Sequence, residues 1–357
     1  MRWFEYLKKK EISLKKPESF NLNSGPSIYI QEENLLDKAG YYCKTVGGST
    51  LVICDNNIYK KFYKNLSNSF KKNKIQNNLF IFSGECCLEE VNNIIKKTKN
   101  KKIDFVFGIG GGKAIDTAKL VSFKLNLPTV VLATSASTCA SWTNVSIVYS
   151  KNGVYKDIIN LNKSADLVLA DETIIKNAPR ELLLAGIGDS FAKYYEAKLV
   201  YESNLVEKNV FSEIGIFIAE KIHKTITNKF DNIKEIIYAN MVLSGWVSTI
   251  GKESCGALLA HSFVNALSII PEARKVLHGY LAGFGVIFQF KFLNKEFQEI
   301  QLYKKLGLPL GFKDINIFLS KKDIEKISKV ILEDDVVKYF YPDVNLDRIV
   351  DTLKAIN

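Results

Sequence analysis

The feature that most constrains the fold is a regular alternation of apolar runs and amphipathic stretches through residues 49–171. The amphipathic stretches have the apolar spacing of helices, and the runs between them are short and rich in β-branched and aromatic residues. Strands that are apolar at every position are typical of a parallel sheet with helices on both faces. We therefore expect an α/β domain whose strands are STLVICD (49–55), NLFIFSG (78–84), IDFVFGIGGG (103–112), PTVVLATS (128–135) and ADLVLAD (165–171).

Two segments depart from this alternation. The run TNVSIVYSKNGVYKDIIN (143–160) has a Lys-Asn-Gly turn between two alternating stretches, which predicts an antiparallel hairpin. After Pro179 the apolar residues recur at helical spacing, with no convincing strand. We expect an α/β domain over residues 1–178 and an all-helical domain over 179–357, with a small-molecule cleft between them.

The composition excludes several classes of protein. Hydrophobic residues make up 47% of the chain and charged residues 24%, as in soluble globular proteins, and no apolar run approaches the ~18 residues of a membrane span. The amino terminus, MRWFEYLKKKEI, lacks the apolar core of a secretion signal, and the six cysteines form no CxxC pair. We expect a cytoplasmic protein with reduced thiols and no membrane partner.

The net charge of +11 does not indicate nucleic-acid binding. Only four of the 49 basic residues are arginine, the residue that favours base reading and bidentate phosphate contacts. The lysines form short clusters such as KKTKNKK (96–102), where predicted helices end and a positive charge is favourable. We expect a solvated surface and no nucleic-acid partner.

A run of glycines follows the third predicted strand and opens a helix, at Gly108-Ile109-Gly110-Gly111-Gly112-Lys113. Glycines there let the backbone N–H groups of the helix start approach a diphosphate. The run matches neither the dinucleotide fingerprint nor the nucleoside-triphosphate loop in full. One or two glycines would suffice for a tight turn, so three in succession favour a phosphate cradle.

Asp55 ends the first predicted strand and has two interpretations. Its carboxylate could accept hydrogen bonds from ribose hydroxyls and repel a 2′-phosphate. It could equally cap the helix that follows. The sequence leaves both open.

Three residues in apolar helical stretches are candidate metal ligands. His261 (ALLAHSFVN) and His278 (KVLHGYLAG) are separated by Pro271, which places them on successive helices, and Asp189 lies in AGIGDSFAKYYEA. One carboxylate and two imidazoles would make an open divalent-metal site with room for substrate. Each residue alone could instead be a satisfied core group. We expect the third histidine, His223, to lie at the surface.

Several motifs together resemble a known family: GIGGGKAIDTAK (108–119), TSASTCASWTNVSIVY (134–149), LLAGIGDSFAKYYEA (183–197), ALLAHSFVNAL (257–267) and VLHG (276–279). In this order they are similar to the glycerol dehydrogenase branch of the iron-containing alcohol dehydrogenase superfamily. The resemblance implies a dehydroquinate-synthase-like fold, with a NAD-binding α/β domain followed by a helical metal domain. It also implies one divalent ion per chain, usually zinc in this branch and iron in sister branches, with the ligands Asp189, His261 and His278.

By matching positions, the resemblance implies a nicotinamide dinucleotide site, and the negative charge of Asp55 favours NAD(H) over NADP(H) because it would repel a 2′-phosphate. Asp55 would face the adenosine ribose. The pyrophosphate would lie against Gly110, Gly111, Gly112, Lys113 and Ala114. The nicotinamide side would be lined by Thr134, Ser135, Ser137, Thr143, Val145 and Tyr149.

Three positions depart from the glycerol dehydrogenase pattern. Cys139 stands where those enzymes carry an aspartate, Val264 where they carry a second histidine, and Lys252 where an apolar aromatic residue is typical. The segment TCASWT (138–143) is similar instead to hydroxycarboxylate dehydrogenase members of the same branch, which reduce short 2-oxo acids. An uncharged Cys139 and a cationic Lys252 would suit an anionic substrate.

The resemblance therefore implies an NAD(P)-linked, metal-dependent dehydrogenase that transfers hydride between nicotinamide and a small 2-oxo or 2-hydroxy acid. The alternatives are a glycerol or other polyol dehydrogenase, an sn-glycerol-1-phosphate dehydrogenase and a dehydroquinate-synthase-like enzyme. That last group usually has a glutamate at the first ligand position, so Asp189 argues against it. The expected partners are a small-molecule substrate and, in a homo-oligomer, further copies of the chain.

Overall fold

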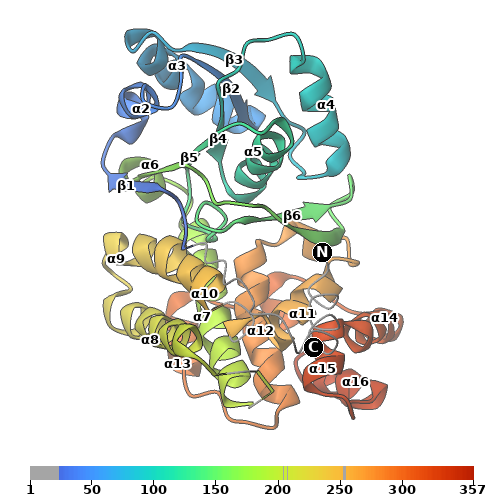
Figure 1. The fold of residues 1–357 in the computed structure, drawn as a ribbon. Coiled ribbons are helices and arrows are strands. Elements are labelled where there is room, and N and C mark those ends of the chain that lie inside the picture. The colour runs from blue at the N-terminus through green and yellow to red at the C-terminus, as the bar shows by residue number, and fades with distance from the viewer. Residues whose placement is uncertain (1–23, 204, 207, 252–254) are drawn as a thin grey trace, which may run out of the picture.

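The computed structural model of the chain describes residues 24–203, 205–206, 208–251 and 255–357. It has an α/β half and a helical half (Figure 1). All six cysteines are buried and free, as expected for reduced thiols. Among the described residues, no helix combines the length and the apolar character needed to cross a membrane.

The α/β half is built on a six-stranded sheet in which all paired strands are parallel, in the order β1-β8-β5-β4-β2-β3. This confirms the predicted parallel sheet. Parallel strands need a crossover connection, which the intervening helices provide. The strands span Ile28–Glu32 (β1), Ser49–Cys54 (β2), Gln76–Ile81 (β3), Phe105–Gly110 (β4), Thr129–Ala133 (β5) and Leu167–Asp171 (β8).

The five predicted strands correspond to β2, β3, β4, β5 and β8, and β1 was missed. β1 is a five-residue edge strand that pairs with β8 and is only partly buried. Its sequence, IYIQE, has an apolar run of only three residues, and none of its residues is fully buried, so the pattern does not stand out. The other edge strand, β3, spans residues 76–81 rather than the predicted 78–84, since its first three residues are polar.

Helices cover both faces of the sheet, and successive residues of the central strands point to opposite faces. Val52 packs on one side with α2 and α3, whereas Leu51 packs on the other side with α4 and α5. Burial on both sides explains why these strands are apolar throughout. The helices of this half span Leu35–Cys43 (α2), Asn56–Lys72 (α3), Leu88–Thr98 (α4), Gly112–Leu125 (α5) and Glu172–Lys176 (α6).

The predicted hairpin is present as a separate two-stranded sheet of β6 (Val145–Tyr149) and β7 (Tyr155–Asn160). Its strands are antiparallel. Gly153 in the turn has φ +78°, a conformation that glycine adopts at little cost. The Lys-Asn-Gly sequence therefore identified the turn correctly.

Lys119 of α5 ties the hairpin and the loop before it to the main sheet. Its ammonium group is buried, donates hydrogen bonds to the carbonyl oxygens of Ala140, Thr143 and Val145, and forms an ion pair with Asp116 at 2.9 Å. A buried charge is stable only when it is paired and hydrogen-bonded in this way. The loop between β5 and β6 is consequently held against the helix that begins at the glycine run.

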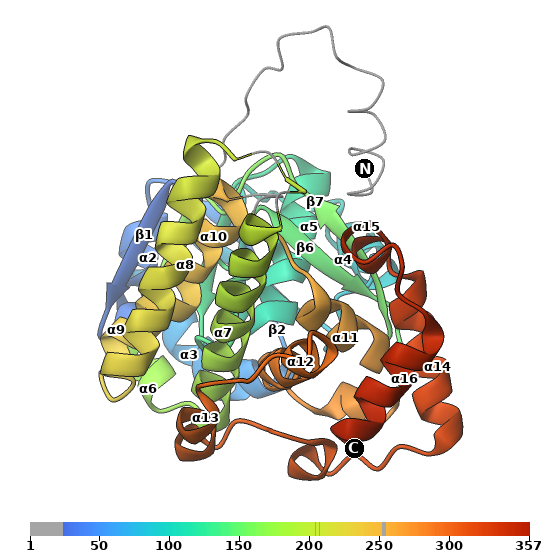
Figure 2. The same ribbon diagram turned by 90° about the horizontal axis from the view of Figure 1, so that it is seen from below.

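Within the described ranges, the residues after Pro179 form helices and no strand, as predicted. Figure 2 shows α7 between α8 and α12. The apolar faces of these helices share one core, which explains the helical spacing of apolar residues. The α-helices span Arg180–Glu202 (α7), Val210–Lys229 (α8), Ile233–Ile237 (α9), Ser244–Ile250 (α10), Leu259–Leu267 (α11), His278–Phe292 (α12), Ile300–Leu306 (α13), Lys321–Glu333 (α14), Asp335–Phe340 (α15) and Leu346–Ala355 (α16).

Glycines allow α7 and α12 to cross in backbone contact. A Cβ on Gly188 would lie 2.3 Å from the carbonyl oxygen of Gly279, and a Cβ on Gly279 would lie 1.8 Å from that of Ala185. Side chains do not tolerate such distances, so this crossing requires glycine. It places Asp189, the residue after Gly188, beside His278, the residue before Gly279.

We expect Gly279→Ala to lower the free energy of unfolding by about 1–3 kcal/mol, because the added methyl group would push the two helices apart. Denaturant unfolding of the purified protein measures the difference. Gly48→Ala is the matched control, since a Cβ there would lie 3.7 Å from the nearest atom, Oδ2 of Asp104. Equal stability of the two variants would contradict the close crossing.

Candidate active site

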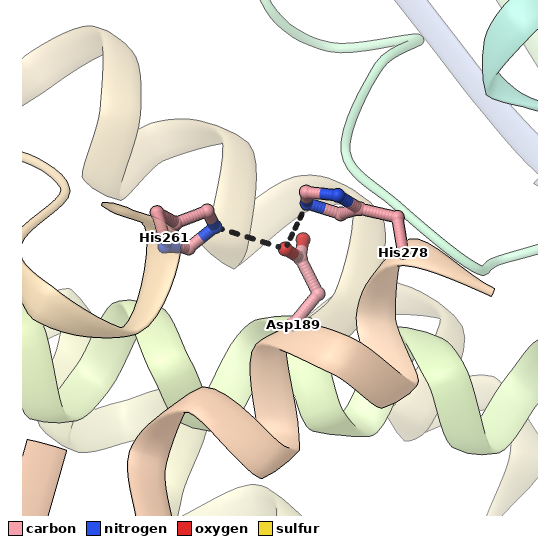
Figure 3. Close-up of side chains that lie close together, drawn as sticks. All are labelled: Asp189, His261 and His278. Atoms are coloured by element: carbon pink, nitrogen blue, oxygen red, sulfur yellow. Dashed lines mark hydrogen bonds and ion pairs between the residues drawn. The ribbon is translucent and has the colours of Figure 1, made fainter. Parts of the chain in front are cut away.

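Three potential metal ligands come together in the helical half. Asp189 lies in the middle of α7, His261 in α11 and His278 at the start of α12. Figure 3 shows the carboxylate of Asp189 between the two imidazole rings. One donor atom from each residue lies within 4.8 Å of the others. The structure thus brings together three side chains that the sequence could only place on separate helices.

The distances between these donors suit a metal ion better than hydrogen bonds. Oδ1 of Asp189 lies 3.3 Å from Nε2 of His261 and 3.5 Å from Nε2 of His278. Hydrogen bonds between N and O atoms cluster at about 2.7–3.2 Å. Adjacent ligands of a tetrahedral ion with ~2.1 Å bonds are about 3.4 Å apart. The side chain of Asp189 is 4% exposed and that of His278 is 38% exposed, so a bound ion would keep an open side next to His278.

Glu196 is a site residue that the sequence patterns did not reveal. Its buried carboxylate accepts the backbone N–H groups of Leu258 at 2.8 Å and His261 at 2.9 Å through Oε1, while Oε2 pairs with Nδ1 of His261. Because Nδ1 is engaged, Nε2 is the ring nitrogen left for a metal. A carboxylate behind a ligating histidine is typical of metal sites, where it fixes the tautomer and the ring orientation.

The two carboxylates make the site attractive to a cation. Burial alone would raise the pKa of Asp189, but the ammonium group of Lys193 and the two imidazoles hold it well below its usual value. Burial alone would lower the pKa of His261, but Glu196 and Asp189 raise it to about 10. A divalent cation would supply the positive charge that protons supply in its absence.

Lys193 is the second site residue that was missed. It follows Asp189 by one turn of α7, and its ammonium group donates to Sγ of Cys139 at 2.7 Å, to Oγ of Ser248 at 3.0 Å and to the carbonyl oxygen of Ser244 at 3.4 Å. Burial opposes its charge, yet the sulfur of Cys139 and the carboxylate of Asp189 raise the pKa of Lys193. A cation therefore stands next to the triad.

A cleft of about 1910 Å³ joins the triad to the glycine run. Gly111 and Gly112 line it from the α/β half, and the three candidate ligands line it from the helical half. Ordinary small-molecule sites have volumes of about 300–1,000 Å³. The cleft is therefore large enough for a dinucleotide together with a small substrate.

The geometry of the glycine run suits a diphosphate. Gly110 has φ +149°, and a Cβ there would lie 2.8 Å from Cβ of Ala114, so the fold itself requires glycine. Gly111 has φ −84° and ψ −172°, which any residue adopts, and a Cβ there would meet only Oγ of Ser135 at 3.7 Å. A ligand that lies against this backbone explains a glycine that the fold does not need. The first backbone N–H groups of α5 lie at the same place and have no acceptor within the helix, so they are suited to bind a diphosphate.

Asp55 has one of its two predicted roles in the structure. Its Oδ1 accepts the backbone N–H groups of Asn57 at 2.8 Å and Ile58 at 3.0 Å, which is the N-cap of α3. The side chain also lines the cleft, and the cap leaves Oδ2 unused. A contact with the adenosine ribose stays a prediction.

The other residues expected at the cofactor divide into two groups. Lys113, Ala114, Ser137, Thr143, Val145 and Tyr149 line the cleft, whereas Gly110, Thr134 and Ser135 do not. Thr134 instead donates its backbone N–H to the carbonyl oxygen of Gly110 at 3.1 Å. The ammonium group of Lys113 pairs with Glu85 at 2.6 Å, so the backbone at this position is better placed than the side chain to bind a diphosphate.

The three positions at which this chain departs from the glycerol dehydrogenase pattern lie in different surroundings. Cys139 lines the cleft and is 6% exposed. Val264 packs in the helical core and does not line the cleft. Lys252 lies outside the described residues.

His223 corrects one expectation, because it is half-buried rather than free at the surface. Its ring stacks on Tyr194 with 4.4 Å between centroids, and Nε2 lies 2.9 Å from Oε1 of Glu299. The charged residues next to it in the sequence suggested solvent. An aromatic neighbour from α7 and a carboxylate far along the chain cover it instead.

We expect Glu196→Gln to weaken the affinity for Zn²⁺ about 10–100-fold. Glutamine keeps an oxygen for the two backbone N–H groups but loses the charge that orients the ring of His261. Titration of Zn²⁺ against a competing chelator measures the affinity. Glu202→Gln, exposed on the same helix, is the control. If the affinity equals that of the wild type, Glu196 only caps the start of α11 and does not support the metal site.

Comparisons with known proteins identify the family of this chain. Residues 26–172 match the model of the family described as iron-containing alcohol dehydrogenase. A glycerol dehydrogenase of Citrobacter freundii is 30% identical over 84% of this chain and 86% of its own length, and hydroxycarboxylate dehydrogenase A of Escherichia coli K12 is 28% identical over 77% and 79%. The crystal structure of a probable glycerol dehydrogenase from Sinorhizobium meliloti has a TM-score of 0.84 at 26% identity, covering 95% of this chain and 98% of that one. This chain therefore belongs to the iron-containing alcohol dehydrogenase family, as its motifs predicted, and is an oxidoreductase that acts on CH–OH groups.

Proposed function

We propose that this protein is a metal-dependent, NAD(H)-linked dehydrogenase that interconverts a small 2-hydroxy acid and the corresponding 2-oxo acid. The observation that carries the proposal is the triad of Asp189, His261 and His278, which opens on the same cleft as the glycine run. In the reducing direction, a bound reduced nicotinamide would supply a hydride to the carbonyl carbon, and the solvent would supply the proton that the carbonyl oxygen takes up. In the reverse reaction the hydride would return to the oxidised cofactor and the proton to the solvent.

The two halves have separate tasks in this reaction. The backbone at Gly111 and the start of α5 would hold the diphosphate of the cofactor. Asp189, His261 and His278 would hold a divalent ion, which stabilises negative charge on the substrate oxygen by several kcal/mol. Glu196 keeps the ring of His261 in place throughout.

The surroundings of Cys139 support an acid as the substrate. Cys139 brings no carboxylate to the cleft, whereas an aspartate at this position would repel an anionic substrate. Hydroxycarboxylate dehydrogenase A is one of the relatives. Lys252, the other residue expected to favour an acid, lies outside the described residues and adds nothing to this support.

Glycerol oxidation is the second candidate. Glycerol dehydrogenases are among the relatives, one of them 30% identical over 84% of this chain. Both candidates use the same metal site, cofactor cleft and hydride transfer. They differ in whether the group next to the reacting carbon is a carboxylate or a hydroxymethyl group.

We expect oxidation of NADH by 2-oxobutyrate to require a divalent ion. Exhaustive chelation should abolish the reaction, and addition of Zn²⁺ or Fe²⁺ should restore it. Asp189→Asn should lower the metal content of the purified protein well below one ion per chain in elemental analysis, because a buried anionic ligand is lost. The exposed Asp343→Asn is the control. Activity that survives chelation would contradict the metal mechanism. Inactivity with 2-oxo acids would contradict the proposed substrate, and inactivity with dihydroxyacetone and aldehydes as well would contradict a dehydrogenase function of the site.

We expect kcat/KM to be higher for NADH than for NADPH, because Asp55 would meet a 2′-phosphate with like charge. Asp55→Asn keeps an oxygen to cap α3 but removes the charge. It should therefore lower the ratio of kcat/KM for NADH to kcat/KM for NADPH about tenfold, or ~1.4 kcal/mol. Asp37→Asn, exposed on α2, controls for the loss of one negative charge elsewhere in the same half. An unchanged ratio would assign Asp55 to helix capping alone.

A further inference from the structure

We propose that Lys193 is the residue that selects an anionic substrate, by binding the carboxylate of a 2-oxo or 2-hydroxy acid whose reacting carbon lies at the triad. The inference rests on the proposed function, since a carboxylate site at Lys193 serves the reaction only if the triad is where hydride transfer occurs. Neither the sequence motifs nor the relatives' names pointed to this residue. Its role follows from where α7 places it.

The position of Lys193 matches the size of a 2-oxo acid. Lys193 and Asp189 are four residues apart on α7, so their side chains leave the same face of the helix with Cβ atoms ~5–6 Å apart. Both residues line the cleft. A 2-oxo acid carries its carbonyl and carboxylate groups on adjacent carbons. With the carbonyl at the triad, the carboxylate therefore comes within reach of the ammonium group.

Lys193 is a cation without a carboxylate of its own among the described residues. Its three hydrogen-bond acceptors are a thiol sulfur, a hydroxyl and a backbone carbonyl, the last at 3.4 Å. The nearby carboxylates of Asp189 and Glu196 are both engaged with His261. Within the described part of the chain, none of the atoms that hold the ammonium group is a carboxylate oxygen, so a substrate carboxylate would form a stronger, charge-assisted hydrogen bond there. Its pKa is raised despite burial, which keeps the group charged at neutral pH.

Cys139 leaves this charge available to a ligand. Its Sγ lies 2.7 Å from Nζ of Lys193, so a carboxylate at position 139 would lie within ion-pair distance and neutralise the ammonium group. A thiol is a weak acceptor that a substrate carboxylate can replace. The combination of Lys193 with Cys139, rather than either residue alone, makes this end of the cleft cationic.

The test compares two substrates of the same carbon skeleton, 2-oxobutyrate and the neutral 1-hydroxy-2-butanone, with the metal-loaded wild type, Lys193→Met and Lys193→Arg. We expect Lys193→Met to lower kcat/KM for 2-oxobutyrate roughly ten- to a hundredfold, mostly through KM, because a charge-assisted hydrogen bond is lost. The value for 1-hydroxy-2-butanone should change less than threefold. Lys193→Arg should recover part of the loss on the acid, since it restores the charge. Lys198→Met, exposed on the same helix, is the control.

The outcomes separate the inference from the function on which it rests. An equal loss on both substrates would assign Lys193 to folding or to proton transfer and overturn the inference, and so would a wild-type preference for the neutral ketone. Either result leaves metal-dependent hydride transfer intact. Failure of the wild type to oxidise NADH with any carbonyl compound would instead overturn the proposed function. Thermal melting and metal content of each variant show whether the fold and the triad are preserved.

A second pair of variants tests the same charge from the other side. Cys139→Asp should pair with Lys193 and lower kcat/KM for 2-oxobutyrate by a similar factor, whereas Cys139→Asn, of the same size but neutral, should lower it less. The ratio between the Asp and Asn variants isolates the charge from the change in shape. A ratio near one would contradict the inference even if Lys193→Met failed to fold.

Discussion

The close crossing of α7 and α12 is the contact on which the candidate site depends. Gly188 and Gly279 bring the two backbones together, and each is the sequence neighbour of a candidate ligand, Asp189 or His278. Because the glycines have no side chains, the neighbouring side chains meet across the crossing instead of being held apart by it. The same feature that packs the helical core thus sets the distance between two of the three donors.

Beyond this crossing, three charged residues of the candidate site lie on one face of α7. Asp189, Lys193 and Glu196 are four and three residues apart, so they share one side of the helix. Asp189 is a candidate ligand, Glu196 holds His261 of α11, and Lys193 places a cation next to the triad. Their charges are linked, since Lys193 lowers the pKa of Asp189 while Glu196 and Asp189 raise that of His261.

The sequence predicted most of the fold and part of the site, for physical reasons that particular residues make clear. Buried strands such as β4 are apolar along their whole length, whereas the edge strand β1 has an apolar run of only three residues and was missed. The histidines stood out as polar residues in apolar helices. Lys193 and Glu196 did not, because in a helix with many charged residues the sequence does not show which ones face a cleft. The sequence left Asp55 with two roles, ribose binding and helix capping, because it both follows a strand and precedes a helix.

A continuous set of contacts connects the glycine run to the triad. α5 begins at Gly112, and Lys119 on the same helix holds the carbonyl oxygen of Ala140 at 2.7 Å. The neighbouring Cys139 accepts from Lys193, which stands one turn from Asp189 on α7. Hydride transfer requires close alignment of its two reactants, and the glycine run and the triad lie in different halves of the molecule. The loop between β5 and β6 is hydrogen-bonded to both halves and gives this alignment a structural basis. This role explains why Lys119 is buried in the α/β half, where an apolar residue would pack at a lower desolvation cost.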